Sequence, residues 1–226
     1  MARLKRISWY RAERGLNPAA IREALEGEEP SADGAEASQD TGLGRKLRSL
    51  RHAAGKTLDQ VAGDIGVTVN TLLLAAWSVV LHRYSGESDV VFGATRAGRR
   101  FHVEGKGTLV GLFINTVPVR VGVDGDREVV GWLQALREQL VQMRPHDHAP
   151  LIKVQSWSEV ARGKPLFESL VVYDHRSLDA QLCAPGGPWQ RRSFEYIGQT
   201  NYPLTVVAYG DDEMLLRIEY SRERFA

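Results

Sequence analysis

The sequence predicts an α/β fold in which a mixed β-sheet is layered with at least two helices. Strand-like apolar runs alternate with helix-like segments along the chain, which is the pattern of an α/β layer. Residues 128–143 repeat apolar side chains at helical spacing, so this segment should be an amphipathic helix lying on a sheet. Two further strand-like runs, 204–209 and 213–220, flank a Gly-Asp-Asp turn and predict a closing hairpin.

The first 42 residues are expected to lie outside the packed unit. Residues 17–27 predict a short helix that Asn17 caps. Residues 28–42 contain no large apolar side chain and predict an exposed polar linker. No comparable gap follows, so 43–226 is predicted to form one packed unit.

Besides the helix at 128–143, two further helices and three strands are expected before the hairpin. Residues 58–65 predict a short amphipathic helix, and Asn70 should cap a second helix that runs to about Tyr84. This second helix is apolar nearly all round, so it should be buried. Pro118 lacks a backbone N–H and places its strand at an edge or a bend. The strands are predicted at 89–95, 109–121 and 167–174. In the last strand of the hairpin, alternation separates Leu216, Ile218 and Tyr220 on one face from Arg217 and Glu219 on the other.

Composition and charge narrow the function classes. The formal net charge is +1, so no bulk field attracts the chain to nucleic acid or to an anionic membrane. Cys183 is the single cysteine and can form neither an internal disulfide nor a cysteine-based zinc site, which suits a reducing cytoplasm. The basic start leads into no apolar stretch, so no signal peptide is expected. The longest apolar run, 72–81, is too short to span a bilayer.

A helix-turn-helix pattern at 58–73 invites a DNA-binding interpretation. A recognition helix needs several cationic or amide side chains that reach base edges. The second helix offers mainly leucine and alanine, and it carries no cation before Arg83. Burial in a core is therefore the expected role of this segment, and no nucleic-acid partner is expected.

His146 and His148 form an HxH pair that could ligate zinc if it lay on a strand. No third ligand with suitable local spacing follows the pair. Pro145 and Pro150 flank it and indicate a loop. No metal site is expected.

Polar residues interrupt the apolar strand at 109–121, namely Asn115, Thr116 and Arg120. Alternation places Asn115 on the face of Phe113, with Thr116 and Arg120 on the other face. A buried amide requires hydrogen-bond partners. Asn115 therefore either braces a neighbouring loop or faces an internal tunnel, and the sequence leaves both alternatives open.

The segment VGLFINTVPVR (110–120) resembles a motif of the condensation domains of nonribosomal peptide synthetases. The motif positions are Gly111, Phe113, Asn115, Thr116 and Arg120. Four other stretches are similar to the same family in order and spacing, at 66–99, 146–151, 164–174 and 200–209. The resemblance covers about 43–225. The sequence departs from the family at Asp147-His148, where Gln-Asp is usual, and at Leu151, where phenylalanine is usual.

The resemblance implies the C-terminal lobe of a two-lobed fold similar to chloramphenicol acetyltransferase. Such domains form amides between acyl groups that are thioester-linked to the phosphopantetheine arms of carrier proteins, in the biosynthesis of secondary metabolites such as antibiotics. The implied partners are peptidyl carrier domains, the N-terminal condensation lobe and adjacent synthetase domains, and no cofactor is bound by this lobe itself. Residues expected at the tunnel between the lobes or at the lobe interface are Gly111, Phe113, Asn115, Thr116, Arg120 and His146. Arg120 is expected to fix the strand or the lobe interface.

The family's catalytic motif, HHxxxDG, belongs to the other lobe and does not occur in this sequence, where no two histidines are adjacent. His175 and Asp179 have the shorter HxxxD spacing, but Ala180 follows where the motif has glycine. We expect no catalytic residue here, so the chain should be inactive alone, as one part of a longer enzyme. An alternative is a free-standing, non-catalytic lobe that binds a carrier or partner protein. A complete acyltransferase that uses His175 is a third interpretation.

Overall fold

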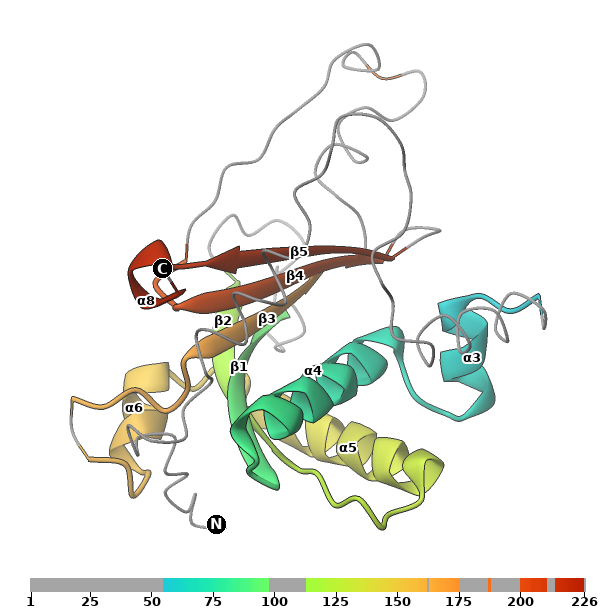
Figure 1. Ribbon diagram of the computed structural model, residues 1–226, viewed down its shortest axis with the longest axis horizontal. Coiled ribbons are helices and arrows are strands. Elements are labelled where there is room, and N and C mark those ends of the chain that lie inside the picture. The colour runs from blue at the N-terminus through green and yellow to red at the C-terminus, as the bar shows by residue number, and fades with distance from the viewer. Residues whose placement is uncertain are drawn as a thin grey trace, which may run out of the picture.

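The computed structural model describes residues 55–97, 113–161, 163–174, 187, 200–210 and 214–225. Several predicted features lie outside these residues: the helix at 17–27, the linker at 28–42, Gly111, Cys183 and the pair His175 and Asp179. The described residues form a β-sheet with helices packed beside it (Figure 1).

The sheet has five strands in the order β2-β1-β3-β4-β5. The strands are β1 (Asp89–Ala97), β2 (Ile114–Gly122), β3 (Ser169–Asp174), β4 (Leu204–Gly210) and β5 (Met214–Tyr220). β3 pairs in parallel with both β1 and β4, whereas β2 and β5 are antiparallel edge strands. The mixed sheet is therefore confirmed, and so are the closing hairpin and the position of Pro118 on an edge strand.

Helix α4 (Val69–Ser85) is capped by Thr68, so the prediction that Asn70 is the cap was wrong. Thr68 has an extended backbone, and its hydroxyl accepts the backbone N–H of Thr71 at 3.2 Å. Asn70 lies inside the first helical turn, where its backbone cannot take the extended conformation of a cap. The helix ends at Gly86, whose φ of 74° is left-handed and easily adopted only by glycine.

The other helices in the described part of the chain are shorter than α4. They are α3 (Leu58–Asp64), α5 (Val129–Met143), the 3₁₀ turn η2 (Arg144–His146), α6 (Leu151–Ser156) and α8 (Arg222–Phe225). α3 and α5 confirm the predicted helices at 58–65 and 128–143. Within the described ranges, no single helix is long and apolar enough to cross a membrane; only α3 and α4 taken together reach that length and composition, and they meet at a 91° bend.

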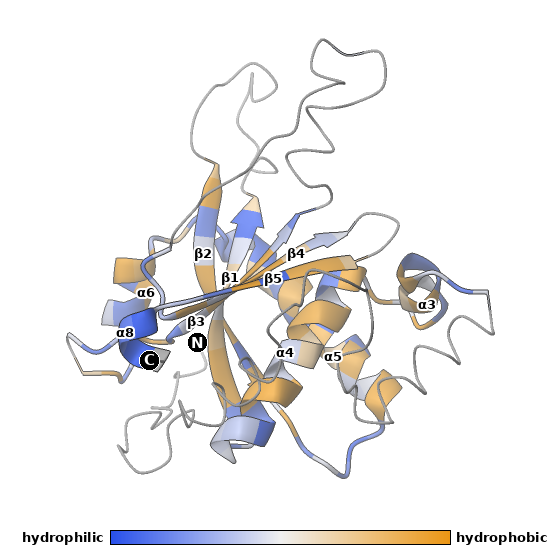
Figure 2. Cartoon of the chain, turned by 45° about the horizontal axis from the view of Figure 1, so that its top comes forward, coloured by the Kyte–Doolittle hydropathy of each residue, from blue (hydrophilic) through white to orange (hydrophobic). Residues whose placement is uncertain are grey.

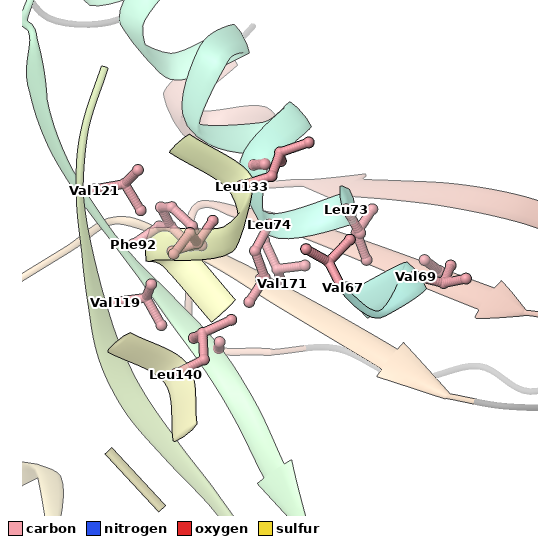
Figure 3. Packing of buried hydrophobic residues seen from close by; sticks show 14 of the residues in the cluster. Val67, Val69, Leu73, Leu74, Phe92, Val119, Val121, Leu133, Leu140 and Val171 are labelled. Atoms are coloured by element: carbon pink, nitrogen blue, oxygen red, sulfur yellow. The ribbon is translucent and has the colours of Figure 1, made fainter. Parts of the chain in front are cut away.

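The core lies between α4, α5 and one face of the sheet. Phe92 of β1, Val119 of β2 and Leu81 of α4 are completely buried in this layer, and Leu136 of α5 is nearly so. Figure 3 shows these elements closing around Phe92 and Val119. Apolar residues are correspondingly concentrated on α4, α5 and the strands beneath them, while α8 is hydrophilic (Figure 2). The predicted burial of the second helix is confirmed on its sheet-facing side, although Val79 and Val80 on its other side are exposed.

The apolar face of β5 is only partly covered. Its register sets Leu216, Ile218 and Tyr220 opposite Ala208, Val206 and Leu204 of β4, so the three share one face as predicted, and that face is the helix-facing one. They are nevertheless 53%, 45% and 46% exposed. Arg217 and Glu219 lie on the other face and form an ion pair at 2.6 Å.

Candidate functional site

Strand β2 carries three of the six residues that the sequence marks as a candidate site, namely Asn115, Thr116 and Arg120. Val117 and Val119 are buried, and Val119 belongs to the core cluster that includes residues of α5. Asn115 continues this helix-facing row at the start of the strand, and it is partly exposed. Thr116 and Arg120 lie on the opposite face and are also partly exposed. The predicted separation of Asn115 from Thr116 and Arg120 is therefore confirmed, whereas the face of Phe113, which precedes β2, stays a prediction.

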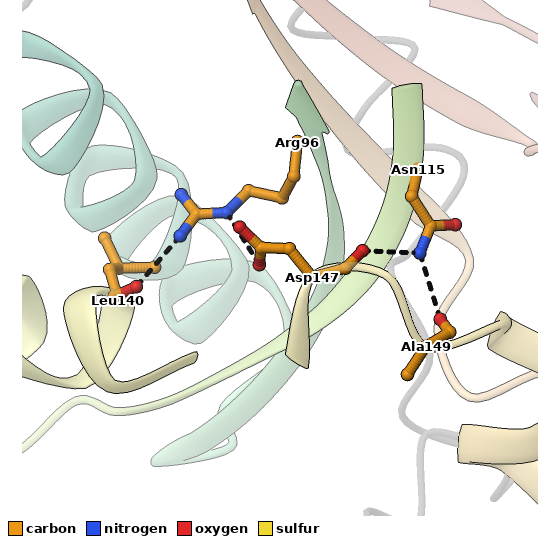
Figure 4. A network of polar contacts seen from close by, with 5 residues as sticks. All are labelled: Arg96, Asn115, Leu140, Asp147 and Ala149. Atoms are coloured by element: carbon orange, nitrogen blue, oxygen red, sulfur yellow. Dashed lines mark hydrogen bonds and ion pairs between the residues drawn. The ribbon is translucent and has the colours of Figure 1, made fainter. Parts of the chain in front are cut away.

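The side chain of Asn115 binds a turn that follows α5. Its amide nitrogen, Nδ2, donates to the backbone carbonyl of Asp147 at 2.8 Å and to that of Ala149 at 2.9 Å (Figure 4). One amide group thus satisfies two carbonyls of a segment more than thirty residues away. The sequence left two roles open for Asn115. These two hydrogen bonds are the contacts expected if Asn115 braces a neighbouring loop.

This segment, called here the 144–150 turn, is a run of tight turns. Its first part is η2, with Pro145 near its start, and Pro150 precedes α6. The N–H of Asp147 donates to the carbonyl of Arg144 at 3.2 Å, and that of Ala149 to the carbonyl of His146 at 2.9 Å. The loop predicted here is confirmed, so His146 and His148 do not share a strand face.

His146 and His148 are both exposed on the 144–150 turn. Among the residues that the structure describes, no group of three or more histidine, cysteine, aspartate or glutamate side chains is placed to hold a metal ion. The absence of a metal site stays a prediction for the whole chain. Of the histidines, His146 alone was predicted as a tunnel or interface residue, and it lies on the turn that Asn115 braces.

Arg96 of β1 holds the same turn, and sequence reasoning missed it. Its Nε donates to Asp147 Oδ1 at 3.2 Å, and its Nη2 donates to the backbone carbonyl of Leu140 at 2.9 Å (Figure 4). The side chains of Arg96 and Asp147 are each only 13% exposed. One signal was available: Arg96 follows Phe92 and Ala94 on the apolar face of β1, where a guanidinium needs partners.

Arg120 pairs with Asp89 on the opposite face of the sheet. Its Nε lies 2.9 Å from both carboxylate oxygens, and Nη2 makes a further contact with Oδ2. This hydrogen bonding raises the pKa of Arg120, and partial desolvation opposes the rise. The pair ties β1 to β2, which is the strand-fixing role expected for Arg120. A part in a lobe interface stays a prediction.

The predicted site residues therefore fall into two groups. Asn115 and His146 belong to the helix-facing side and the 144–150 turn. Thr116 and Arg120 lie on the other face of β2, and Phe113 precedes the strand, partly buried. The sixth residue, Gly111, lies outside the described residues.

A second feature missed from the sequence is an aromatic pair on the face opposite the helices. Phe167 is buried, and its ring covers Gly93 of β1. Tyr202 stacks on Phe167, with ring centroids 5.2 Å apart and planes inclined by 22°. Burial raises the pKa of Tyr202. A glycine inside a strand was the available signal, because it permits such a close approach.

Comparison with known sequences identifies relatives. The sequence matches the model of the family described as "Condensation domain" over residues 23–226. One of the linear gramicidin synthase proteins of Brevibacillus parabrevis is 41% identical over 180 residues, which are 79% of this chain and 2% of that protein. Chondramide synthase cmdD of Chondromyces crocatus is 38% identical over 157 residues, which are 70% of this chain and 4% of that protein. The chain thus spans a small part of these curated relatives.

Solved structures share the fold. The four-domain nonribosomal peptide synthetase AB3403, crystallised with AMP and glycine, matches with a TM-score of 0.60 and 21% identity, over 71% of this chain and 13% of that one. The condensation domain of the Monacolin K polyketide synthase MokA matches with a TM-score of 0.55 and 18% identity, over 89% of this chain and 46% of that one. The predicted α/β class is confirmed by these matches and by the observed sheet.

Proposed function

This chain belongs to the condensation-domain family, and on that basis we propose that the protein containing it forms amide bonds between carrier-tethered acyl or aminoacyl thioesters. The observation that carries the proposal is the family match over 23–226 together with close relatives among peptide synthetases. A free-standing binding lobe is not favoured, because these relatives are large synthetases.

The proposed reaction joins an acceptor amine to a donor thioester. The amine nitrogen attacks the thioester carbonyl, a carbon–nitrogen bond forms and the carbon–sulfur bond breaks. The amine loses a proton, and the released pantetheine thiolate gains one. Such a step needs a base or charge stabiliser within hydrogen-bond reach of the amine, and it needs the two arms to be held together.

We place that base in the other lobe of the protein. The sequence contains no adjacent histidines and therefore no HHxxxDG motif. Of the described histidines, His82 Nδ1 lies 2.8 Å from the carbonyl of Glu87, and His146 and His148 are exposed on a turn. None of these positions provides a pair of neighbouring histidines.

This chain is proposed to be the C-terminal lobe and to supply the wall of the tunnel together with a surface for carriers. β2 suits a wall because it is an edge strand with partly exposed polar residues on both faces. The proposed partners are peptidyl carrier domains, whose phosphopantetheine arms bring the substrates, and the N-terminal lobe. A reducing cytoplasm suits the free thiols of this chemistry and the lone Cys183.

The test uses the intact protein that contains this chain. Purified protein is mixed with one carrier loaded with an aminoacyl donor and another loaded with an aminoacyl acceptor, and the carrier-bound product is identified by mass spectrometry. The dipeptide should form, and replacing the second histidine of the HHxxxDG motif upstream of this chain with alanine should abolish it. Intact protein that forms no amide with any loaded pair, or whose rate survives that substitution, would contradict the proposal.

A further inference from the structure

Arg96 closes the C-terminal end of α5. The backbone N–H of Arg144, just beyond the helix, turns back to the carbonyl of Val141. The carbonyl of Leu140 thus lacks the Arg144 N–H that a continuing helix would supply, and Arg96 Nη2 donates to it at 2.9 Å. A guanidinium at this position also complements the negative end of the helix dipole. Pro145, which has no N–H to continue the helix, follows at once. Arg96 therefore caps α5 at the point where the helix ends and the 144–150 turn begins.

Asp147 is held by two neighbouring strands at once. Arg96 of β1 binds its carboxylate, and Asn115 of β2 binds its backbone carbonyl (Figure 4). Arg96 and Asn115 are directly opposite in the antiparallel ladder of β1 and β2, so their side chains leave the sheet on the same face. Arg96, Asn115 and Asp147 together are called here the turn clamp.

Stability alone does not account for this arrangement. A largely buried ion pair is often no more stabilising than apolar residues of the same size, because both charges must leave water. It does fix geometry, since the guanidinium donates in set directions to two separate acceptors. The side chains of Arg96 and Asp147 are largely buried, whereas His146 and His148, on the same turn, are exposed. The clamp thus sets the position of an exposed surface.

We infer that Arg96 is a positioning residue for condensation: through the turn clamp it sets the place of the 144–150 turn, and with it His146, relative to β2. The inference rests on the proposed function, which makes β2 and this turn part of the tunnel wall. Its contribution is indirect, because Arg96 itself is mostly buried and acts through Asp147 and Leu140.

The test compares Arg96→Met and Arg96→Lys with wild type in the intact protein, by hydrogen exchange and by steady-state condensation of loaded carriers. The control is Arg127→Met, because the Arg127 side chain is exposed and its ion pair with Asp124, at 3.9 Å, is exposed as well. In Arg96→Met, the amides of Asp147 and Ala149 should exchange at least roughly tenfold faster while those of α4 keep their rates. kcat should fall roughly tenfold, and KM for the carriers should change less than about twofold. Arg96→Lys should give exchange rates and a kcat between those of Arg96→Met and wild type, because one ammonium cannot reach both acceptors.

Three results would overturn the inference: unchanged exchange in the turn, equal acceleration throughout α4, or an unchanged kcat in Arg96→Met. Unchanged exchange would show that the clamp does not hold the turn. Equal acceleration in α4 would show that Arg96 only stabilises the fold as a whole. An unchanged kcat would show that the position of the turn does not affect the reaction. An inactive wild-type protein would instead contradict the proposed function, and it would remove the basis for a role in condensation. The exchange measurement would still decide whether the clamp holds the turn.

Discussion

Gly93 lies directly against the ring of Phe167: a Cβ atom added to Gly93 would come within 2.3 Å of Phe167 Cε2. Both residues are buried, and the ring is also stacked on Tyr202. The contact joins β1 to the segments just before β3 and β4, so it links three of the stretches by which the sequence resembles its family.

Gly93→Ala is therefore expected to destabilise the protein. The added methyl group must displace an aromatic ring that is packed on both sides, and overpacking of this kind costs about 1–3 kcal/mol. The midpoint of denaturant unfolding measures the effect. Gly122→Ala is the matched control, because a Cβ at Gly122 would meet no atom within 4 Å. Equal midpoints for Gly93→Ala and Gly122→Ala would show that the ring moves freely.

The N-cap of α4 gives a second prediction. Thr68→Ala removes the hydroxyl that accepts the N–H of Thr71, and loss of such a cap costs about 1 kcal/mol. Asn70→Ala should cost much less, because Asn70 lies inside the helix and alanine is the better helix former. Thermal unfolding of the two variants separates them. A larger loss for Asn70→Ala would restore the cap assignment made from the sequence.

The regular elements were predictable because each is encoded locally. The helix at 128–143 follows from its apolar spacing, and β2 and the hairpin follow from alternation. The N-cap residue of α4 could not be predicted, since Thr68 and Asn70 are both good capping residues and only the backbone angles decide between them.

The candidate site was predictable only in part. Alternation correctly separated Asn115 from Thr116 and Arg120. The turn clamp could not be predicted, because Arg96 and Asp147 are 51 residues apart and an arginine near the end of a strand usually faces solvent. The resemblance marked Asn115 as a motif residue but gave no indication of what its amide binds.

Asn115→Ala tests whether the amide braces the turn. It leaves two carbonyls without their donor, and such a loss costs about 1–3 kcal/mol when the groups are shielded from water. The denaturant midpoint should fall, and single-turnover condensation in the intact protein should be measured beside it. An unchanged midpoint together with a loss of rate of at least roughly tenfold would refute the bracing role and place Asn115 in the reaction itself.

His146 and His148 are not expected to hold structural zinc. Two exposed imidazoles on a turn make an incomplete site, because structural zinc takes four ligands. Elemental analysis of protein purified without added metal should find no stoichiometric zinc. Zinc present at one equivalent and lost in His148→Ala would overturn this prediction.

The central claim is that this chain supplies the tunnel wall and a surface for carriers, while another part of the protein supplies the catalytic base. Its most direct test is amide formation by the 226-residue chain alone, with folding verified by circular dichroism, beside the intact protein under the same conditions. We predict product from the intact protein and none above the uncatalysed background from the chain. Turnover by the chain alone that is abolished in His175→Ala would contradict the claim and assign the catalysis to His175.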